Sequence, residues 1–131
     1  MYFRDNYSMK SKKSHLLGAE GETRAKNLLV EKGYSILQEN WRFKKYEVDI
    51  IASFRDIIVF VEVKSRSSIG FGEPETFVNK KKQGFLVSAA NEYLILNNIE
   101  FECRFDVVSV LQINNTFIVK HLEAAFYPSI K

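Results

Sequence analysis

Three residues near the middle of the chain, Asp49, Glu62 and Lys64, have the types and spacing that phosphodiester hydrolysis requires. Glu62 and Lys64 are two positions apart in an apolar run, so in a strand their side chains would share one face, about 7 Å apart. Carboxylate oxygens suit Mg²⁺ or Mn²⁺ better than Zn²⁺, and a nearby ammonium group can orient water or stabilise developing charge. These residues therefore indicate metal-assisted hydrolysis.

The two acids can meet across a β-hairpin. If Arg55–Asp56 forms a two-residue loop, Phe54 faces Ile57, and counting back places Asp49 directly opposite Glu62. Directly opposed residues have Cβ atoms about 5 Å apart, which is close enough for both acids to hold one divalent ion. Arg-Asp is not a favoured tight-turn pair, so a longer loop with a shifted register remains an alternative.

The alternation of side chains supports this arrangement. The even positions of 46–52 are apolar or aromatic, so Glu47 and Asp49 are expected to share the opposite face. Like charges opposed across a strand pair are destabilising, and a bound cation would relieve them. Neutralisation by Lys64 or Lys45 on an exposed sheet face explains the same pattern without a metal.

The wider pattern predicts an α/β fold in the order αβββαββ, with a mixed sheet flanked by helices. Residues 1–17 are expected to form a flexible basic tail, and residues 18–131 a single domain. Asn79 can cap the second helix, and the loop before it, rich in Gly and Ser, is expected to be irregular. The predicted helices cover 18–32 and 79–97, and the predicted strands cover 35–43, 46–54, 57–64, 103–111 and 116–122.

Composition limits the possible settings. The 131 residues are 46% hydrophobic, enough to bury one core. The lone Cys103 cannot form an internal disulfide, which favours a reducing, cytoplasmic location. The sequence has no signal-peptide pattern and no run of about 18 apolar residues, so a soluble protein without a membrane partner is expected.

The net charge of +3 is only mildly basic, but the positive residues are clustered. A basic rim around an acidic centre is what a phosphate-binding site requires, although solvated loops explain the same clusters. The clusters lie at residues 10–13, 42–45, 64–66 and 80–82.

Several short motifs resemble known proteins. Asp49, followed by Glu62-Val63-Lys64, resembles the motif of the PD-(D/E)XK nuclease superfamily. Almost all of residues 18–126 resembles the YraN-like family of small uncharacterised bacterial proteins, which is itself similar to the archaeal Holliday junction resolvases. The motifs that carry the resemblance are GAEGE at 18–22, EVDII at 47–51, FVEVKSR at 60–66 and RFDVV at 104–108.

The resemblance implies a restriction-endonuclease-like fold and a Mg²⁺- or Mn²⁺-dependent endodeoxyribonuclease, with branched DNA among its possible substrates. It implies that Asp49, Glu62 and the backbone carbonyl of Val63 bind the metal, that Lys64 assists catalysis, and that Glu22 reaches the site from the first helix. Two symmetric cuts in a junction would favour a homodimer.

Glu22 also has support from helical spacing, because it precedes Ala25 and Leu29 by three and seven residues and lies at the margin of the apolar stripe. A carboxylate near a helix start, favoured by the macrodipole, is an equally good interpretation.

Lys82 matches a family position and precedes the inward-facing Phe85 by three residues, so it is a candidate phosphate contact together with Arg66 and Lys80. An ordinary solvated run of lysines explains 80–82 as well. Asp106 is expected to be a hydrogen-bonded structural acid rather than a ligand.

The functional expectation is a metal-dependent endonuclease that hydrolyses DNA. The alternatives from other classes are a nucleic-acid binding module that keeps the fold but does not cleave, and a protein-interaction scaffold. Asp49, Glu62 and Lys64 favour the nuclease, because a pure binder has no need for opposed acids that face phosphate.

Overall fold

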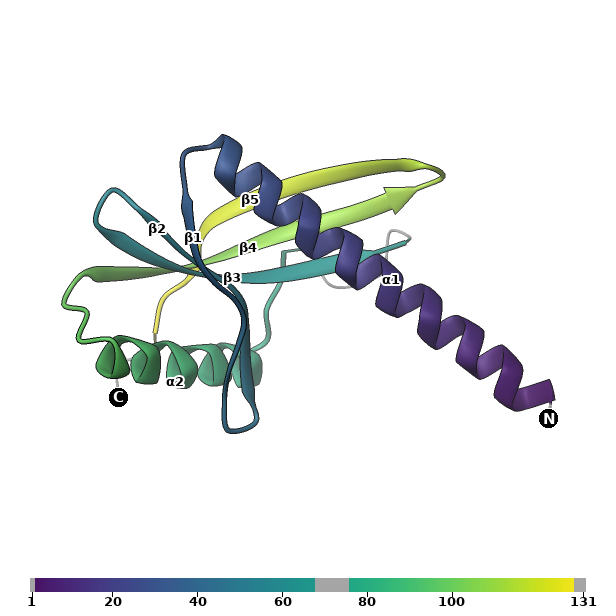
Figure 1. Cartoon of the computed structure of the whole chain (residues 1–131), viewed down its shortest axis with the longest axis horizontal. Coiled ribbons are helices and arrows are strands. Elements are labelled where there is room, and N and C mark those ends of the chain that lie inside the picture. Colours follow the sequence, from purple (N-terminus) through teal and green to yellow (C-terminus); the bar gives the residue numbers. More distant parts are fainter. Residues whose placement is uncertain (1, 68–75, 129–131) are drawn as a thin grey trace.

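Five strands form one mixed sheet, with α1 on one face and α2 on the other (Figure 1). The computed structural model describes residues 2–67 and 76–128, with side-chain environments from residue 16 onward. The elements are α1 (Tyr2–Glu31), β1 (Ser35–Phe43), β2 (Tyr46–Phe54), β3 (Ile57–Arg66), α2 (Lys80–Leu96), β4 (Glu102–Ile113) and β5 (Thr116–Phe126).

The strand order is β1-β2-β3-β4-β5, and only β3 and β4 are parallel. Parallel neighbours need a crossover connection, and α2 lies within it. The predicted order αβββαββ and the predicted α/β class, a mixed sheet flanked by helices, are confirmed.

Some predicted elements are shorter than those of the structure. The first helix begins at Tyr2 rather than at residue 18, because Gly18 only weakens a helix interior and does not end it. The division into a tail and a domain stays a prediction. β3 continues to Arg66, into the segment predicted to be irregular; residues 68–75 of that segment lie outside the described residues.

The β2–β3 hairpin has the predicted two-residue loop. Arg55 and Asp56 have φ values of 48° and 65°, as a type I′ turn requires at both central positions. Phe54 pairs with Ile57, so the predicted register is confirmed although Arg-Asp is not a favoured sequence for this turn.

Each face of the sheet carries its own apolar core. Strands β3 and β4 are almost continuously hydrophobic because both of their faces are buried, as is usual for parallel strands covered by helices. The α1 layer contains Ala25, Leu29, Ile50, Val59, Val61 and Val108. The α2 layer contains Leu86, Ala89, Tyr93, Val48, Phe60 and Phe105.

Strand β2 changes sides at Asp49. Val48 packs in the α2 layer whereas Ile50 packs in the α1 layer, so the prediction that all even positions of 46–52 share one face is wrong. The ladder between β2 and β3 ends at Ile50–Val61, while β2 stays paired with β1. The released end of the β1–β2 hairpin approaches α2 (Figure 1), where Tyr46 contacts Phe85 with ring centroids 5.0 Å apart.

Asp106 is the structural acid that the sequence predicted. It is 1% exposed, and it accepts hydrogen bonds from Arg104, His121 Nε2 and the Ala124 N–H. Burial by itself raises its pKa, but these hydrogen bonds outweigh burial and hold the pKa below its usual value. They tie β4 to β5 near the end of the sheet.

Gly21 allows α1 to approach β3 closely. A Cβ at this position would lie 1.9 Å from Ser65 Oγ and 3.1 Å from Ser65 Cβ. Gly18, on the same helix, has nothing within 4 Å of the corresponding position. The close approach is therefore local to Gly21, and it sets the height of the next residue, Glu22, above the sheet.

Gly21→Ala should lower the free energy of unfolding by about 1–2 kcal/mol, because overpacking outweighs the gain in helix propensity. Ser65→Gly removes both clashing atoms, so the double variant should lose less than the two single changes together. Urea unfolding of all four proteins measures this coupling. Gly18→Ala is the matched control and should be neutral or stabilising. Coupling below about 0.5 kcal/mol would mean that α1 does not depend on this contact.

Candidate active site

Asp49 and Glu62 are in hydrogen-bonding contact where β2 leaves β3. Continued pairing would bring Val48 opposite Val63, but the Val63 N–H instead donates to Asp49 Oδ2 at 2.8 Å. The Asp49 side chain therefore replaces the lost backbone partner, and the same bond aims its carboxylate at Glu62. The Glu62 side chain is only 12% exposed, so two acids share a poorly solvated position.

The pKa of Asp49 is raised to about 8. Burial is the largest cause, followed by the hydrogen bond and repulsion from Glu62, while the Val63 N–H lowers it. Without a cation, this pair is therefore most stable when it holds a proton near neutral pH. A divalent ion can replace that proton and neutralise both groups.

Glu22 reaches the same acidic centre from α1. Burial raises its pKa, and so does the charge of Asp49, while a hydrogen bond with Asn40 lowers it. Asn40 lies in β1 and has a positive φ of 51°. The predicted approach of Glu22 to the site is thus present, and Asn40 is a neighbour that sequence reasoning missed, although an Asn inside a strand pattern signals such a backbone irregularity.

Two lysines were predicted at the site, and one of them, Lys82, contacts an acid. Lys82 Nζ lies 3.4 Å from Glu62 Oε2, and it is placed there by the first turn of α2, where the Asn79 side chain accepts a hydrogen bond from the Lys82 N–H. Lys64 Nζ donates to the Phe77 carbonyl. That carbonyl was not foreseen, because nothing in the sequence signals which backbone oxygen approaches β3.

The other two predicted phosphate contacts, Lys80 and Arg66, lie farther along their elements from the acid pair. Lys80 is exposed at the first residue of α2, and among the described residues it makes no ion pair with either acid. Arg66 is partly buried at the end of β3, two residues beyond Lys64. The structure thus brings Asp49, Glu62 and Lys82 together and places Glu22 within electrostatic range of Asp49. Lys64 instead contacts the Phe77 carbonyl.

The donor set suits a hard divalent cation. Asp49 and Glu62 supply carboxylate oxygens in contact with each other, and oxygen-only sites favour Mg²⁺ or Mn²⁺. In the part of the chain that the structure describes, no group of three or more His, Cys, Asp or Glu side chains is placed to hold a metal. A site here would therefore need backbone oxygen and water, as Mg²⁺ sites usually do.

These features define an α/β protein with two helices on a five-stranded sheet and a paired-acid site at the point where β2 and β3 separate. The model of the uncharacterised protein family UPF0102 matches residues 21–110. The chain belongs to this family, which confirms the resemblance to YraN-like proteins.

Individual relatives agree with the family model. A UPF0102 protein of Flavobacterium psychrophilum is 50% identical over 111 residues, which cover 85% of this chain and 93% of the relative. UPF0102 proteins of Alkaliphilus oremlandii and Chlorobaculum parvum are 45% and 44% identical, covering 84% of this chain and 97% and 91% of their own lengths. Their common name assigns no activity. Of the described helices, none has the length and apolar character to cross a membrane.

Asp49→Asn should raise the stability of the metal-free protein at alkaline pH. Because the folded-state pKa is raised from 3.8 to about 8, ionisation of Asp49 removes stability as the pH rises through that range. Asn cannot ionise and keeps the shape and the acceptor for Val63. In a chelator at pH 8.5, the variant should gain on the order of 1–2 kcal/mol after allowance for solvent screening.

Chemical unfolding between pH 4 and 9 tests this expectation. The gain should vanish near pH 4, and Mg²⁺ should stabilise the parent but not the variant. Asp56→Asn, in the exposed hairpin turn, is the control and should show no such pH dependence. A difference in stability between the parent and Asp49→Asn that is the same at pH 4 and pH 8.5 would contradict the expectation that ionised Asp49 destabilises the metal-free protein.

Proposed function

We propose that this protein is a Mg²⁺- or Mn²⁺-dependent endodeoxyribonuclease, with branched DNA among its substrates. The observation that carries the proposal is the contact of Asp49 with Glu62 in a poorly solvated position bordered by Lys82. Two opposed acids destabilise a sheet unless a cation lies between them. A neighbouring cationic side chain then suits a polyanionic substrate.

Asp49, Glu62 and the Val63 carbonyl would hold the metal, which when bound supplies charge to neutralise the phosphate and to acidify the attacking water. Asp49 is kept in position by the Val63 N–H. Glu22 lies within electrostatic range of Asp49, and burial is the main cause that raises its pKa, so its carboxylate is placed to act as a general base toward the attacking water.

The lysines have separate roles in this mechanism. Lys82 pairs with Glu62 in the metal-free protein, and metal binding would release its ammonium group to bind a substrate phosphate. Lys64 donates to the Phe77 carbonyl. Its ammonium group is fixed near the site and can stabilise the charge that develops on the phosphate oxygens. A homodimer would allow two cuts in a symmetric junction.

Lys64→Met should abolish most cleavage while preserving binding. A preorganised charge that acts on the transition state is worth about 10² to 10³ in rate, and Met keeps the apolar stem packed along β3. The measurement is metal-dependent cleavage of branched, duplex and single-stranded DNA, with affinity measured separately. Affinity should change by well under about tenfold, since the lost interaction belongs to the transition state.

Lys32→Met, at an exposed position directly after α1 and outside the four basic clusters, is the matched control and should cleave at the parental rate. Parental activity in Lys64→Met would exclude this mechanism. If parent and variant both bind DNA and neither cleaves any substrate, the non-cleaving binding module is the correct class. If neither binds DNA in a salt-dependent way, the protein-interaction scaffold is favoured.

Lys82→Ala should reduce the salt dependence of DNA binding. Each phosphate neutralised on duplex DNA contributes about −0.9 to the slope of log affinity against log salt, so losing one contact should flatten the slope by about one unit. Lys80→Ala removes a more exposed lysine from the same helix turn and is the control. Equal slopes for the two variants would assign Lys82 to the solvated run.

A further inference from the structure

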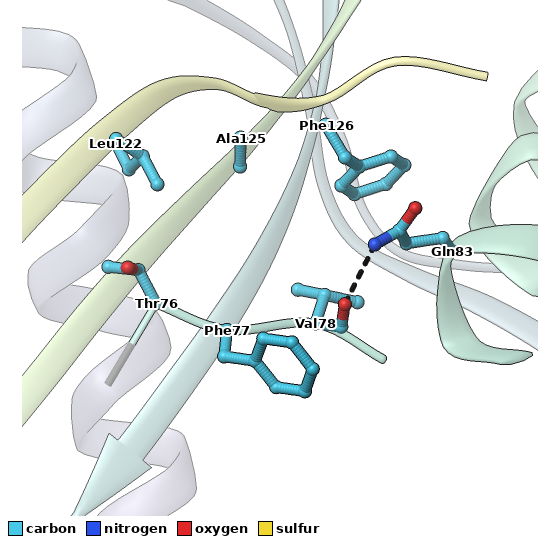
Figure 2. Close-up of a pocket in the computed structure, with 7 residues that line it drawn as sticks. All are labelled: Thr76, Phe77, Val78, Gln83, Leu122, Ala125 and Phe126. Carbon is cyan, nitrogen blue, oxygen red and sulfur yellow. Dashed lines mark hydrogen bonds between the residues drawn. The ribbon is translucent and has the colours of Figure 1, made fainter. Parts of the chain in front are cut away.

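A pocket of about 320 Å³ lies beside the candidate active site, between β5 and the segment that leads into α2 (Figure 2). One wall is formed by Leu122, Ala125 and Phe126 of β5, and the facing wall by residues 76–78. Gln83, from the first turn of α2, closes one end. This volume is at the small end of the roughly 300–1,000 Å³ range of small-molecule sites, so it suits a single ring system.

Two contacts place the pocket next to the groups of the candidate active site. Phe77 lines the pocket, and its carbonyl accepts the hydrogen bond from Lys64. Lys82 and Gln83 are neighbours on α2, and Lys82 faces Glu62 while Gln83 faces the pocket. A phosphate at the acids and a ring in the pocket would therefore be adjacent parts of one ligand.

The lining has the chemistry of a heterocycle site. Phe126 is fixed in the pocket because it also stacks on Phe105, with ring centroids 5.0 Å apart. Gln83 Nε2 donates to the Val78 carbonyl at 2.8 Å, which fixes the amide with its oxygen on the side of Phe126 (Figure 2). An amide oxygen held in this way can accept a hydrogen bond from the amino or imino N–H of a nucleobase.

We propose that this pocket binds one unpaired nucleobase of the strand whose phosphate lies at Asp49 and Glu62. The proposal rests on the proposed nuclease function and adds a basis for substrate choice. A base inside a duplex is stacked and paired, and extruding it costs a few kcal/mol, least where it is already unpaired. The pocket therefore selects DNA with an unpaired base beside the bond to be cut.

Fluorescence anisotropy with three DNAs tests this selection, with Ca²⁺ in place of Mg²⁺ to separate binding from cleavage. The DNAs are a duplex with one unpaired adenine, the same duplex with an abasic nucleotide at that position, and the fully paired duplex. The parent should bind the unpaired adenine on the order of tenfold or more tighter than the abasic site, the effect expected for one base that contacts an aromatic pocket.

Ala125→Leu fills the pocket without removing a charge or a core contact. It should abolish the preference for the unpaired adenine and leave affinity for the other two DNAs unchanged. Thr116→Leu places the same side chain at an exposed position at the other end of β5 and should retain the preference. Gln83→Met replaces the amide oxygen with a weak acceptor and should weaken the preference, so it tests the pocket even if Ala125→Leu fails to fold.

The outcomes separate the two proposals. Equal parental affinity for the unpaired adenine and the abasic site overturns the nucleobase pocket, and so does a preference that Ala125→Leu retains. Either result leaves metal-dependent cleavage untouched if the parent still cuts DNA. Failure of the parent to bind any DNA overturns the nuclease function and the pocket with it.

Discussion

The site depends on one substitution of partners: the Asp49 carboxylate, rather than a β2 backbone carbonyl, accepts the hydrogen bond from the Val63 N–H. A buried N–H needs an acceptor, so β2 can leave β3 here only because a side chain supplies one. The same bond holds Asp49 against Glu62. The separation of β2 from β3 and the contact between the two acids therefore depend on the same hydrogen bond.

The two helices bring further charged side chains close to the acid pair. Gly21 lets α1 pack against Ser65, so that Glu22 comes within electrostatic range of Asp49. On the opposite face, the Asn79 cap orders the first turn of α2 and directs Lys82 to Glu62. The two apolar layers keep these approaches rigid, which an acid pair with a raised pKa needs if its geometry is to survive repulsion.

The same first turn of α2 also lies between the acid pair and the pocket. Consecutive residues of a helix point in different directions. Lys82 therefore contacts Glu62, whereas the next residue, Gln83, lines the pocket. In the proposed function, this arrangement would place the recognition of a phosphate beside the recognition of a nucleobase. Phosphate contacts position a nucleic acid, whereas contacts to a base add selectivity.

The sequence by itself determined the elements, the α/β class and the register of the central hairpin, because these depend on local alternation and on a two-residue loop. It also predicted that Asp49 and Glu62 meet, although the β2–β3 ladder ends one residue pair before them. The prediction that Asp106 is a hydrogen-bonded structural acid is confirmed. Only the tertiary structure decided the change of sides at Asp49, the link between Lys64 and Phe77, and the pocket under β5. These features arise where segments distant in the sequence meet, and such contacts leave no periodic signal along the chain.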